Sequence, residues 1–584
     1  MDNTEKEYYE KFWHTTAHVF ANALTELYPN VKIAIGPPID AGFHYDFELE
    51  KSIDAKEMEQ IEKKMNEILK RKEEVIRKEI LVKEALELFK ENPYKVEMIN
   101  DLEKEGETKI GTYTNGKFTD MCKGPHLEST AEIGAVKLLK ISAAYWKGNE
   151  KNKQLQRIYG ISFKTQKELD EFIAAKEKAE ANDHNKIGRE LELFMTSDLV
   201  GQGLPLLMPK GAKIIQILQR FIEDEEEKRG YVYTKTPFLA KSELYKVSGH
   251  WDHYREKMFL LGDEKKGEEV YGLRPMTCPY QFQIYKNSSK SYRDLPIKYA
   301  ETSTLFRNET SGEMHGLIRI RQFTISEGHL IVTPEQLETE FKGVLDLINY
   351  VMKTLKIEND ISYRFSKWDP KDKEKYINNP EAWEHSQNEM KKILDHLGIQ
   401  YEEADGEAAF YGPKLDLQFK NVYGKEDTII TVQIDFALPE RFDMTYTDKD
   451  GKKKRPYVIH RTSIGCYERT LAMLIEKHGG AFPLWLSPEQ VKIIPISDKF
   501  NEYAKQVHSK LIDAAVRVKL DDRNETLGYR IREAQKEKVP YALIVGAKEA
   551  EIGTVAVRPR NGNQEVMPLE KFIEKVLKEI KEKM

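Results

Sequence analysis

The chain is short of cysteine, of long apolar runs and of net charge. Its 584 residues include three cysteines, too few and too scattered for the disulfide framework of a secreted domain, so we expect reduced thiols that serve ligation or chemistry. No apolar run approaches about 18 residues and no leader follows Met1, which predicts a cytoplasmic protein without a membrane span. The formal charge of −6 excludes a whole-chain footprint for nucleic acid, so RNA binding would have to come from local patches.

The length predicts several domains, because a single hydrophobic core rarely grows much past about 200 residues. We expect a first domain at residues 1–165, a linker helix at 166–195, a central domain at 196–488 and a terminal domain at 489–584. The segment KTQKELDEFIAAKEKAEANDHNKIGREL has few large apolar residues, which is typical of a connector. The expected fold class is therefore α+β with several domains.

Each block of the chain has its own pattern of apolar residues. In the first block, the β-type runs VKIAIGPP and FHYDFEL precede a helix expected from about Asp54 to Lys90. The core-facing residues at helical spacing are Met58, Ile61, Met65, Ile68 and Leu69. The central block mixes amphipathic helices with β-rich runs, which indicates an antiparallel sheet with helices packed around it. The last block alternates β-branched runs such as YALIVG with helical segments, an α/β pattern. The basic run from Lys452 to Arg455 is interpreted as a hairpin turn.

The first domain carries a group of histidines and a thiol. His14 and His18 are four residues apart, so on a helix their imidazoles would share one face. Alone, such a pair is more often an ordinary feature of a surface helix than a ligand pair. The segment CKGPH adds Cys122 and His126, with Asp120 just before it. Together these groups could bind a metal ion or position a water for hydrolysis, and their spacing does not decide between the two.

Two motifs in the central block indicate binding of a phosphate-bearing ligand. In ETSTLFRNETSGEMHGLIRIRQF, a predicted hairpin presents Arg307, Glu309, Arg319 and Phe323, which offer a guanidinium to a phosphate, a carboxylate to a base and a ring for stacking. The alternative is a charged hairpin with surface ion pairs only. In IGCYERTLAMLIEKHG, Arg469 lies on an otherwise apolar helix, where an arginine is costly unless it meets an anion.

These two motifs, with Pro237 in YVYTKTPFLA, resemble the three signatures of class II aminoacyl-tRNA synthetases in order. From about Trp13 to the C-terminus the chain resembles threonyl-tRNA synthetases. The resemblance implies an antiparallel sheet core with flanking helices, an N-terminal α+β editing domain and a C-terminal α/β anticodon-binding domain. It also implies a homodimer that uses ATP with Mg²⁺ to join L-threonine to tRNA(Thr) through an adenylate. Arg307 would contact the α-phosphate, Phe323 the adenine and Arg469 the γ-phosphate, with Glu309 and Arg319 in the same ATP site.

The resemblance assigns the scattered cysteines and histidines to two sites. Cys278, His329 and His460 match the ligands of one catalytic zinc ion. Threonine and valine are near-isosteres that an apolar pocket separates by no more than about 100-fold, whereas zinc can recognise the hydroxyl. Serine lacks only a methyl group, worth roughly 1–3 kcal/mol, and must be removed after charging. The resemblance gives that hydrolysis to an editing site without a bound metal, formed by His14, His18, Lys95, Asp120, Cys122 and His126.

Further roles are implied by matching positions. The threonine and adenylate would be contacted by Met276, Glu327, Tyr411, Gln433, Asp435 and Cys466. Lys414 would place a positive charge near the reaction centre and His250 would lie near the ribose, so both are expected to act in catalysis with Arg307 and Arg469. The positions expected to read anticodon bases are Asn524, Arg532, Glu549 and Arg558.

The sequence also departs from the family pattern. The family's usual ubiquitin-like N-terminal domain is expected to be absent. Ile325 and Glu327 stand where Gln and Asp are common, Cys466 stands where Ser is common, and Tyr280-Gln281 replaces a segment in which a His often follows the zinc-binding cysteine. Glu327 is longer than Asp by about one bond length, which leaves the amino-acid specificity open. The alternatives are a ligase for serine or proline, a non-charging paralogue that binds RNA as a regulator, and a deacylase in which only the editing block is active.

Overall fold

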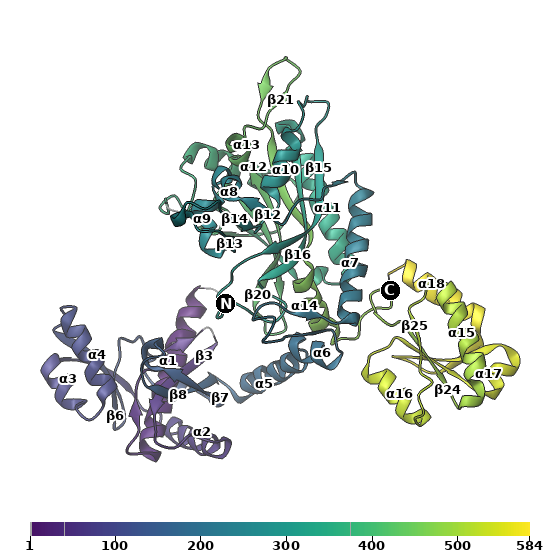
Figure 1. Ribbon diagram of the computed structural model, residues 1–584. Helices are drawn as coiled ribbons and strands as arrows, with labels where there is room; N and C mark the ends of the chain where they lie inside the picture. Colours follow the sequence, from purple (N-terminus) through teal and green to yellow (C-terminus); the bar gives the residue numbers. More distant parts are fainter. Residues whose placement is uncertain (1–2, 40, 374, 584) are drawn as a thin grey trace. The chain divides into compact units, whose positions relative to one another are not determined.

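The computed structural model describes residues 3–39, 41–373 and 375–583. By its internal contacts the chain divides into two compact units, Met1–Glu177 and Lys178–Met584 (Figure 1). Among the described residues, no helix is long and apolar enough to cross a membrane. The two units are described separately.

The first unit has two sheets. The larger has the strand order β1-β3-β8-β7, with β2 paired to β3, and the smaller has the order β4-β5-β6. The helix α1 packs on the larger sheet through a cluster of buried aromatic and aliphatic side chains. The strands are β1 Lys32–Ile33, β2 Pro38–Ile39, β3 Gly42–Glu48, β4 Val75–Leu81, β5 Lys109–Asn115, β6 Phe118–Met121, β7 Ala135–Tyr145 and β8 Gln154–Phe163. The helices are α1 Asn3–Leu27, α2 Ala55–Leu69, α3 Val82–Leu88, α4 Pro93–Lys104 and α5 Gln166–Ala181, the last of which contains the division between the units.

The helix expected from Asp54 to Lys90 is correct only in its first half. It begins where predicted, because Asp54 and Glu57 form a capping box, and four of the five predicted stripe residues are buried. It ends at Leu69, where the apolar stripe ends. The prediction of one continuous helix beyond this point is wrong, because Val75–Leu81 forms a strand paired along its whole length with β5, and a separate helix α3 follows at Val82–Leu88. The β-branched residues of VIRKEI favour the strand, and helical periodicity does not continue into that segment.

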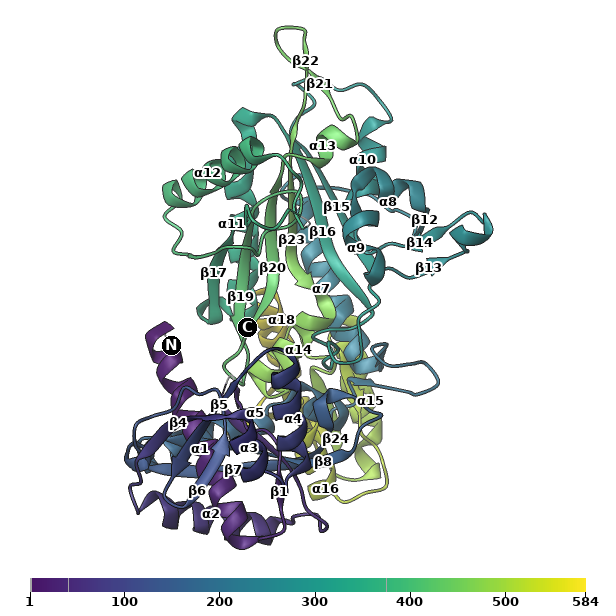
Figure 2. The same cartoon turned by 90° about the vertical axis from the view of Figure 1, so that its left-hand side faces the viewer.

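The central part of the second unit is built on an eight-stranded sheet with the order β11-β15-β16-β23-β20-β19-β17-β18. Figure 2 shows β17, β19, β20, β23, β16 and β15 side by side in this order. All neighbours are antiparallel except the edge pairs β11–β15 and β17–β18. The helices α7, α11 and α14 share one large apolar core with the sheet. These findings confirm the predicted antiparallel core with helices around it.

The elements of this part have the following bounds. The strands are β9 Phe194–Met195, β10 Leu206–Leu207, β11 Val232–Tyr233, β12 Leu239–Lys241, β13 Leu260–Leu261, β14 Tyr271–Leu273, β15 Ile297–Phe306, β16 Gln322–Val332, β17 Ile361–Ser366, β18 Glu402–Ala404, β19 Lys414–Lys420, β20 Glu426–Asp435, β21 Tyr446–Thr447, β22 Lys453–Lys454 and β23 Tyr457–Cys466. The helices are α6 His184–Glu190, α7 Pro209–Glu227, α8 Ser242–Ser248, α9 His250–Tyr254, α10 Cys278–Lys286, α11 Leu337–Leu355, α12 Pro380–His396, α13 Leu438–Arg441 and α14 Tyr467–His478.

Two local predictions concern this region. The connector segment forms two helices, α5 and α6, because Asp183 caps a new helix by accepting hydrogen bonds from the backbone N–H groups of Asn185 and Lys186. The basic run Lys452–Arg455 lies in the β21–β22 hairpin, which confirms the predicted turn.

The C-terminal part has a five-stranded sheet with the order β25-β24-β26-β27-β28. The strand β24 is parallel to β25 and β26, and β27 is antiparallel to its neighbours. This arrangement, with helices between the strands, confirms the predicted α/β pattern. The strands are β24 Val491–Pro495, β25 Val518–Leu520, β26 Tyr541–Val545, β27 Thr554–Pro559 and β28 Glu565–Pro568, and the helices are α15 Asn501–Asp513, α16 Leu527–Lys536, α17 Ala547–Ile552 and α18 Leu569–Lys581.

Candidate active site and histidine-cysteine clusters

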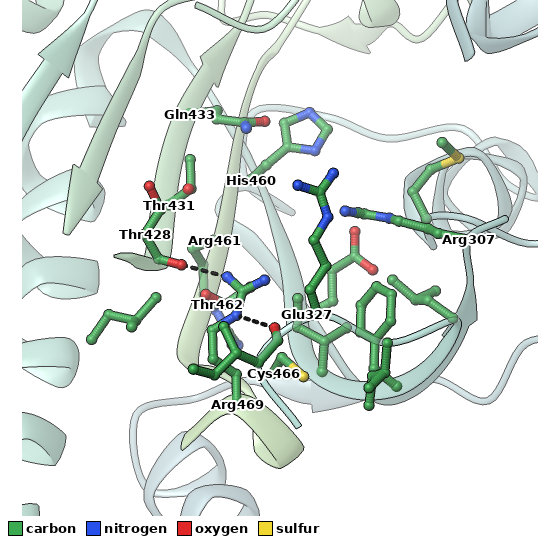
Figure 3. Close-up of a pocket in the computed structure, with 18 of the residues that line it drawn as sticks. Arg307, Glu327, Thr428, Thr431, Gln433, His460, Arg461, Thr462, Cys466 and Arg469 are labelled. Carbon is green, nitrogen blue, oxygen red and sulfur yellow. Dashed lines mark hydrogen bonds between the residues drawn. The ribbon is translucent and has the colours of Figure 1, made fainter. Parts of the chain in front are cut away.

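A cavity of about 550 Å³ lies over the middle strands of the eight-stranded sheet (Figure 3). Side chains of β15, β16, β20, β23 and α14 meet in it. The residues expected from the sequence that line it are Met276, Cys278, Arg307, Glu309, Arg319, Phe323, Glu327, Tyr411, Gln433, His460, Cys466 and Arg469. Four others, His250, His329, Lys414 and Asp435, are not among its lining residues.

Arg307 directs a cation with unused donors toward the cavity. It follows directly after β15, whose pairing with β16 ends at Phe306 opposite Gln322. Its guanidinium lies 5.0 Å over the ring of Phe323. Its buried Nε has no hydrogen-bond partner, and its Nη2 makes only a 3.5 Å contact with the carbonyl oxygen of Pro275. A buried donor without a partner is costly, so this geometry suits an anionic ligand.

A second arginine of the hairpin, Arg319, forms ion pairs with carboxylates. Arg319 Nη2 lies 3.0 Å from Glu309 Oε2 and 3.4 Å from Glu313 Oε1. Lys257 joins the same group, 2.6 Å from Glu313, and its ammonium holds the pKa of Glu313 down at about 2. The hairpin therefore combines a network of ion pairs with one arginine, Arg307, whose Nε has no hydrogen-bond partner.

Arg469 is held by carbonyl oxygens. It lies in the first turn of α14, where its Nε donates to the carbonyl oxygen of Ile318 at 2.9 Å and its Nη1 donates to that of Thr428 (Figure 3). No carboxylate compensates its charge in these contacts, and burial lowers its pKa. The predicted need for an anion on this helix is thus left to a ligand of the cavity.

Cys278, His329 and His460 converge on one point. His329 on β16 and His460 on β23 are direct partners in the strand register, and Cys278 is the first residue of α10. One ligand atom of each lies within 4.8 Å of the others, and all three residues are buried. Burial raises the pKa of Cys278 and lowers that of His329 well beyond their ordinary values.

These three residues fit a divalent metal ion. The buried Nε2 of His329 has no hydrogen-bond partner, which leaves its lone pair available. The remote nitrogens of both rings have oxygen partners: His329 Nδ1 lies 2.5 Å from Gln281 Oε1, and His460 Nε2 lies 2.8 Å from Asp435 Oδ2. Such outer partners are usual for metal-ligating histidines. One sulfur and two nitrogen ligands favour zinc and leave a fourth position open.

Polar groups and an apolar patch line the cavity beside Cys278, His329 and His460. Glu327 Oε2 accepts a hydrogen bond of 3.1 Å from the backbone N–H of Thr277, and burial raises its pKa. The hydroxyl of Tyr411 donates to Gln433. The two unusual residues Ile325 and Cys466 lie opposite each other on β16 and β23 and form an apolar patch with Leu305, Ile320 and Phe323.

Two residues expected to act in catalysis, Lys414 and His250, contact other side chains of the protein and do not line the cavity. Lys414 forms a 2.6 Å ion pair with Asp416 on the same strand. His250 is buried, its ring packs against Phe410, and burial lowers its pKa to about 3. His250 is therefore a neutral imidazole near neutral pH.

Sequence reasoning missed several lining residues, although a signal for them exists. On β20, Asp427, Ile429 and Thr431 line the cavity together with the predicted Gln433. Alternate residues of a strand point to the same face, so counting back by twos from Gln433 would have found all three. On β23, Thr462 relates to His460 in the same way.

The histidines and the thiol of the first unit also come together. His14 and His18 lie on α1, and Cys122 Sγ lies 3.1 Å from His14 Nε2 and 3.3 Å from His126 Nε2. Burial lowers the pKa of each of the three imidazoles and raises that of Cys122 to about 11. The cluster is therefore neutral near pH 7, with an unpartnered Nδ1 on His18. Its four ligand atoms also lie within 4.8 Å of one another.

Lys95 and Asp120 form a buried ion pair in the same unit. Lys95 Nζ lies 2.6 Å from Asp120 Oδ1, and both side chains are 2% exposed. Asp120 also accepts hydrogen bonds from the Tyr45 hydroxyl at 2.8 Å and from the Met121 backbone N–H at 2.8 Å. These contacts anchor the strand end from which Cys122 follows.

The four expected base-reading positions lie in different elements. Asn524 precedes α16 and is exposed, and Arg532 is exposed on α16 itself. Glu549 caps its own helix α17 by accepting a hydrogen bond from the Gly546 N–H at 3.0 Å. Arg558 lies on β27 and is half-buried.

Comparison with known proteins places these features in a family. Residues 257–478 match the tRNA synthetase class II core domain (G, H, P, S and T), residues 490–579 match an anticodon binding domain, and residues 110–159 match the threonyl and alanyl tRNA synthetase second additional domain. The chain is 61% identical over 576 residues to a threonine–tRNA ligase of Clostridium perfringens, which covers 98% of this chain and 89% of the relative. It is 48% identical over 573 residues to a threonine–tRNA ligase of a Geobacillus species, covering 97% of this chain and 88% of the relative.

A solved structure of part of a related protein agrees with this match. The RNA binding domain of threonyl-tRNA synthetase from Cryptosporidium parvum superposes with a TM-score of 0.64 at 35% identity, covering 68% of this chain and 98% of that one. The fold is thus that of the class II aminoacyl-tRNA synthetases, as the sequence predicted. Within this class, the chain belongs to the threonine–tRNA ligase family.

We expect the buried Lys95–Asp120 pair to be important for stability. Replacing Lys95 by Met leaves Asp120 as a buried charge without its partner, which should lower the free energy of unfolding by about 3–5 kcal/mol. The matched control is Lys90→Met, because Lys90 pairs with Glu87 at 2.7 Å but both side chains are mostly exposed, and its cost should not exceed about 1 kcal/mol. Denaturant unfolding of the full chain measures both, and equal shifts would refute the assignment.

Proposed function

We propose that the protein attaches L-threonine to tRNA(Thr) in two steps, with ATP and Mg²⁺, as a cytoplasmic homodimer. The observation that carries this proposal is the single cavity in which Arg307, Arg469 and two of the three metal-ligand candidates meet. The predicted boundaries at residues 165, 195 and 488 are proposed to separate the editing, linker, catalytic and anticodon-binding parts. The segment containing Pro237 is proposed to form the dimer contact.

The proposed first step is activation of the amino acid. The threonine carboxylate attacks the α-phosphorus of ATP, the bond to the bridging oxygen breaks, and pyrophosphate leaves with its electron pair. Arg307 and Arg469 supply partly buried positive charge whose hydrogen bonds go to carbonyl oxygens, which suits a reaction whose negative charge shifts between phosphates. Phe323 offers a ring for the adenine, and Glu309 and Arg319 complete the ATP site.

Recognition of threonine is proposed to occur beside Cys278, His329 and His460. These residues would hold a zinc ion, which supplies a Lewis acid for the amino group and the hydroxyl of threonine and so discriminates against valine. Glu327, Tyr411 and Gln433 would orient the same groups, with Met276, Asp435 and Cys466 around them. Because Asp435 hydrogen-bonds His460, we propose that it acts through that ring.

The proposed second step transfers the threonyl group to the terminal ribose of the tRNA. The ribose hydroxyl attacks the carbonyl carbon of the adenylate and its proton passes to a phosphate oxygen. The bond between the carbonyl carbon and the phosphate oxygen breaks, and AMP leaves. His250 is neutral near pH 7 and can accept or donate a hydrogen bond at the ribose. Lys414 would stabilise the phosphate from its ion pair with Asp416. Asn524, Arg532, Glu549 and Arg558 would contact anticodon bases.

Editing of seryl-tRNA(Thr) is proposed for the cluster of the first unit. Neutral imidazoles can accept a hydrogen bond from a water molecule and so position it, and His14, His18 and His126 are neutral near pH 7 because burial lowers the pKa of each. Cys122 would fix two of these rings through its sulfur contacts. Lys95 and Asp120 would support the site as a buried anchor.

An amino-acid panel in the exchange of pyrophosphate into ATP tests substrate and reaction together. We expect exchange with threonine, at most weak exchange with serine, none with valine or proline, and loss of exchange after zinc is removed by a chelator. Exchange that is strongest with serine or proline would establish the altered specificity suggested by Ile325 and Glu327. Absence of exchange with every amino acid would overturn the proposal and favour a non-charging RNA-binding protein.

Replacing His18 or Cys122 by Ala tests the editing role. We expect threonine-dependent exchange within about twofold of wild type, and accumulation of seryl-tRNA(Thr) that the wild-type protein hydrolyses, with deacylation reduced roughly 100-fold or more. The control is His44→Ala, a histidine of the same unit outside the cluster, which should leave deacylation unchanged. If either cluster variant abolishes threonine charging as well, the proposal that editing and charging occur at separate sites is wrong.

A further inference from the structure

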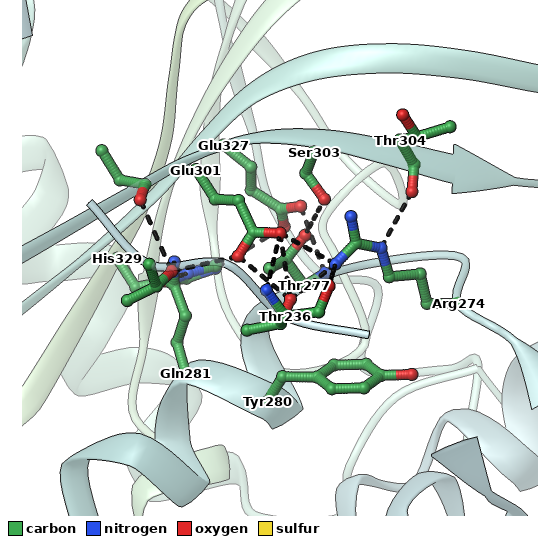
Figure 4. Close-up of polar contacts among 12 residues, drawn as sticks. Thr236, Arg274, Thr277, Tyr280, Gln281, Glu301, Ser303, Thr304, Glu327 and His329 are labelled. Atoms are coloured by element: carbon green, nitrogen blue, oxygen red, sulfur yellow. Dashed lines mark hydrogen bonds and ion pairs between the residues drawn. The ribbon is translucent and has the colours of Figure 1, made fainter. Parts of the chain in front are cut away.

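A buried hydrogen-bonded chain lies behind the metal-ligand candidates (Figure 4). Gln281 lies one turn after Cys278 on α10 and is fully buried. Its Oε1 lies 2.5 Å from His329 Nδ1, and its Nε2 donates to Thr234 Oγ1 at 2.8 Å. Both ends of this amide are therefore engaged, one by a candidate zinc ligand and one by the segment that leads to Pro237.

The orientation of the Gln281 amide is fixed from its far end. Thr234 Oγ1 lies 3.0 Å from Glu301 Oε2 and donates its only proton to that carboxylate. The hydroxyl oxygen can then only accept from Gln281, so the NH₂ group of the amide must face Thr234 and the carbonyl oxygen must face His329.

Glu301 is itself held in place. Its carboxylate accepts hydrogen bonds from Thr236 Oγ1 at 3.0 Å and lies 2.9 Å from Arg274 Nη1. Both Glu301 and Arg274 are buried. The carboxylate that accepts the hydrogen bond from Thr234 is therefore anchored by a buried ion pair. The direction of each hydrogen bond is then fixed from Glu301 through Thr234 and Gln281 to His329.

We propose that Gln281 is a positioning residue that sets the tautomer of His329. An acceptor oxygen at Nδ1 requires the ring proton there, so the lone pair of Nε2 points to the site shared with Cys278 and His460. The absence of any hydrogen-bond partner at that buried Nε2 agrees with this assignment. The inference rests on the proposed zinc site and adds a residue that determines how well the ring can ligate.

Three variants separate this role from simple packing. Gln281→Leu keeps the approximate volume but removes the acceptor, Gln281→Glu keeps an acceptor at His329, and Gln490→Leu is the matched control. Gln490 is also fully buried and uses both ends of its amide, donating to Leu484 O at 2.9 Å and accepting from Arg517 N–H at 3.0 Å. It lies in the segment that leads into β24, outside the cluster of Cys278, His329 and His460.

The measurements are zinc affinity by competition with a chromophoric chelator and the absorption spectrum of the Co²⁺-substituted full chain. We expect Gln281→Leu to weaken zinc binding about 10–100-fold and to change the ligand-field bands, and Gln281→Glu to stay within about threefold of wild type. Gln490→Leu should leave both readouts unchanged even if it lowers the melting temperature. Unchanged zinc affinity in Gln281→Leu, or equal losses in the Leu and Glu variants, would overturn the inference.

A second substitution tests the transmission along the chain. Thr234→Val removes the acceptor of the amide NH₂, so we expect a smaller loss of zinc affinity than in Gln281→Leu, and no additional loss when the two are combined. Additive losses would overturn the chain. A wild-type protein that binds no zinc overturns both this inference and the proposed zinc site, whereas zinc binding that is insensitive to Gln281 overturns this inference alone.

Discussion

The architecture of the cavity depends on the pairing of β16 with β23. In this register His329 lies opposite His460, and a shift by one residue would turn one of them to the other face of the sheet. The register then changes between Glu327 and Ile325, because Glu327 pairs with Thr462 but Ile325 pairs with Cys466. The extra residues of β23 are accommodated by Ser326, whose Oγ accepts hydrogen bonds from the backbone N–H groups of Ser463 at 3.0 Å and Ile464 at 3.1 Å.

This irregularity connects the strand to the helix that carries Arg469. Gly465 has a φ of +76°, and a Cβ atom there would lie 2.1 Å from the carbonyl oxygen of Ile429, so only glycine fits without a shift of the backbone. The chain then turns into α14, and Arg469 in its first turn reaches the carbonyl oxygens of Ile318 and Thr428. The positions of the metal-ligand candidates and of the second arginine thus follow from one pairing of strands.

Four arginines of the central part fall into two groups by the chemistry of their partners. Arg274 and Arg461 pair with the buried carboxylates of Glu301 and Glu226 at 2.9 and 2.5 Å. Their charge is neutralised within the protein, as expected of groups that hold the fold. Arg307 and Arg469 have only carbonyl oxygens as hydrogen-bond acceptors, so their charge is left to act on a ligand.

The antiparallel core and the α/β terminal part could be predicted from strand and helix patterns, which are local signals. The family and the convergence of Cys278, His329 and His460 followed from the resemblance of the motifs to threonyl-tRNA synthetases. The prediction from sequence failed where the structure of a segment depends on a contact with a residue or strand that is distant in the sequence. The run VIRKEI has β-branched residues that favour a strand, but its pairing partner β5 lies further along the chain and cannot be read from the run itself. Gln281 is a second example. Its departure from the family pattern is visible in the sequence, but its contact with His329 depends on the packing of α10 against β16.

The two histidine-cysteine clusters use the same donor types in different states, and this difference supports different roles. Around Cys122, the thiol sulfur already lies within hydrogen-bonding distance of the Nε2 atoms of His14 and His126, whereas the buried Nδ1 of His18 has no hydrogen-bond partner. Around Cys278, the buried Nε2 of His329 has no hydrogen-bond partner and lies 3.6 Å from Glu327 Oε1, while its Nδ1 contacts an amide oxygen. An unpaired buried nitrogen costs free energy that a bound metal ion would recover. In the Cys122 cluster the same cost falls on the buried Nδ1 of His18, while Cys122 already contacts the rings of His14 and His126.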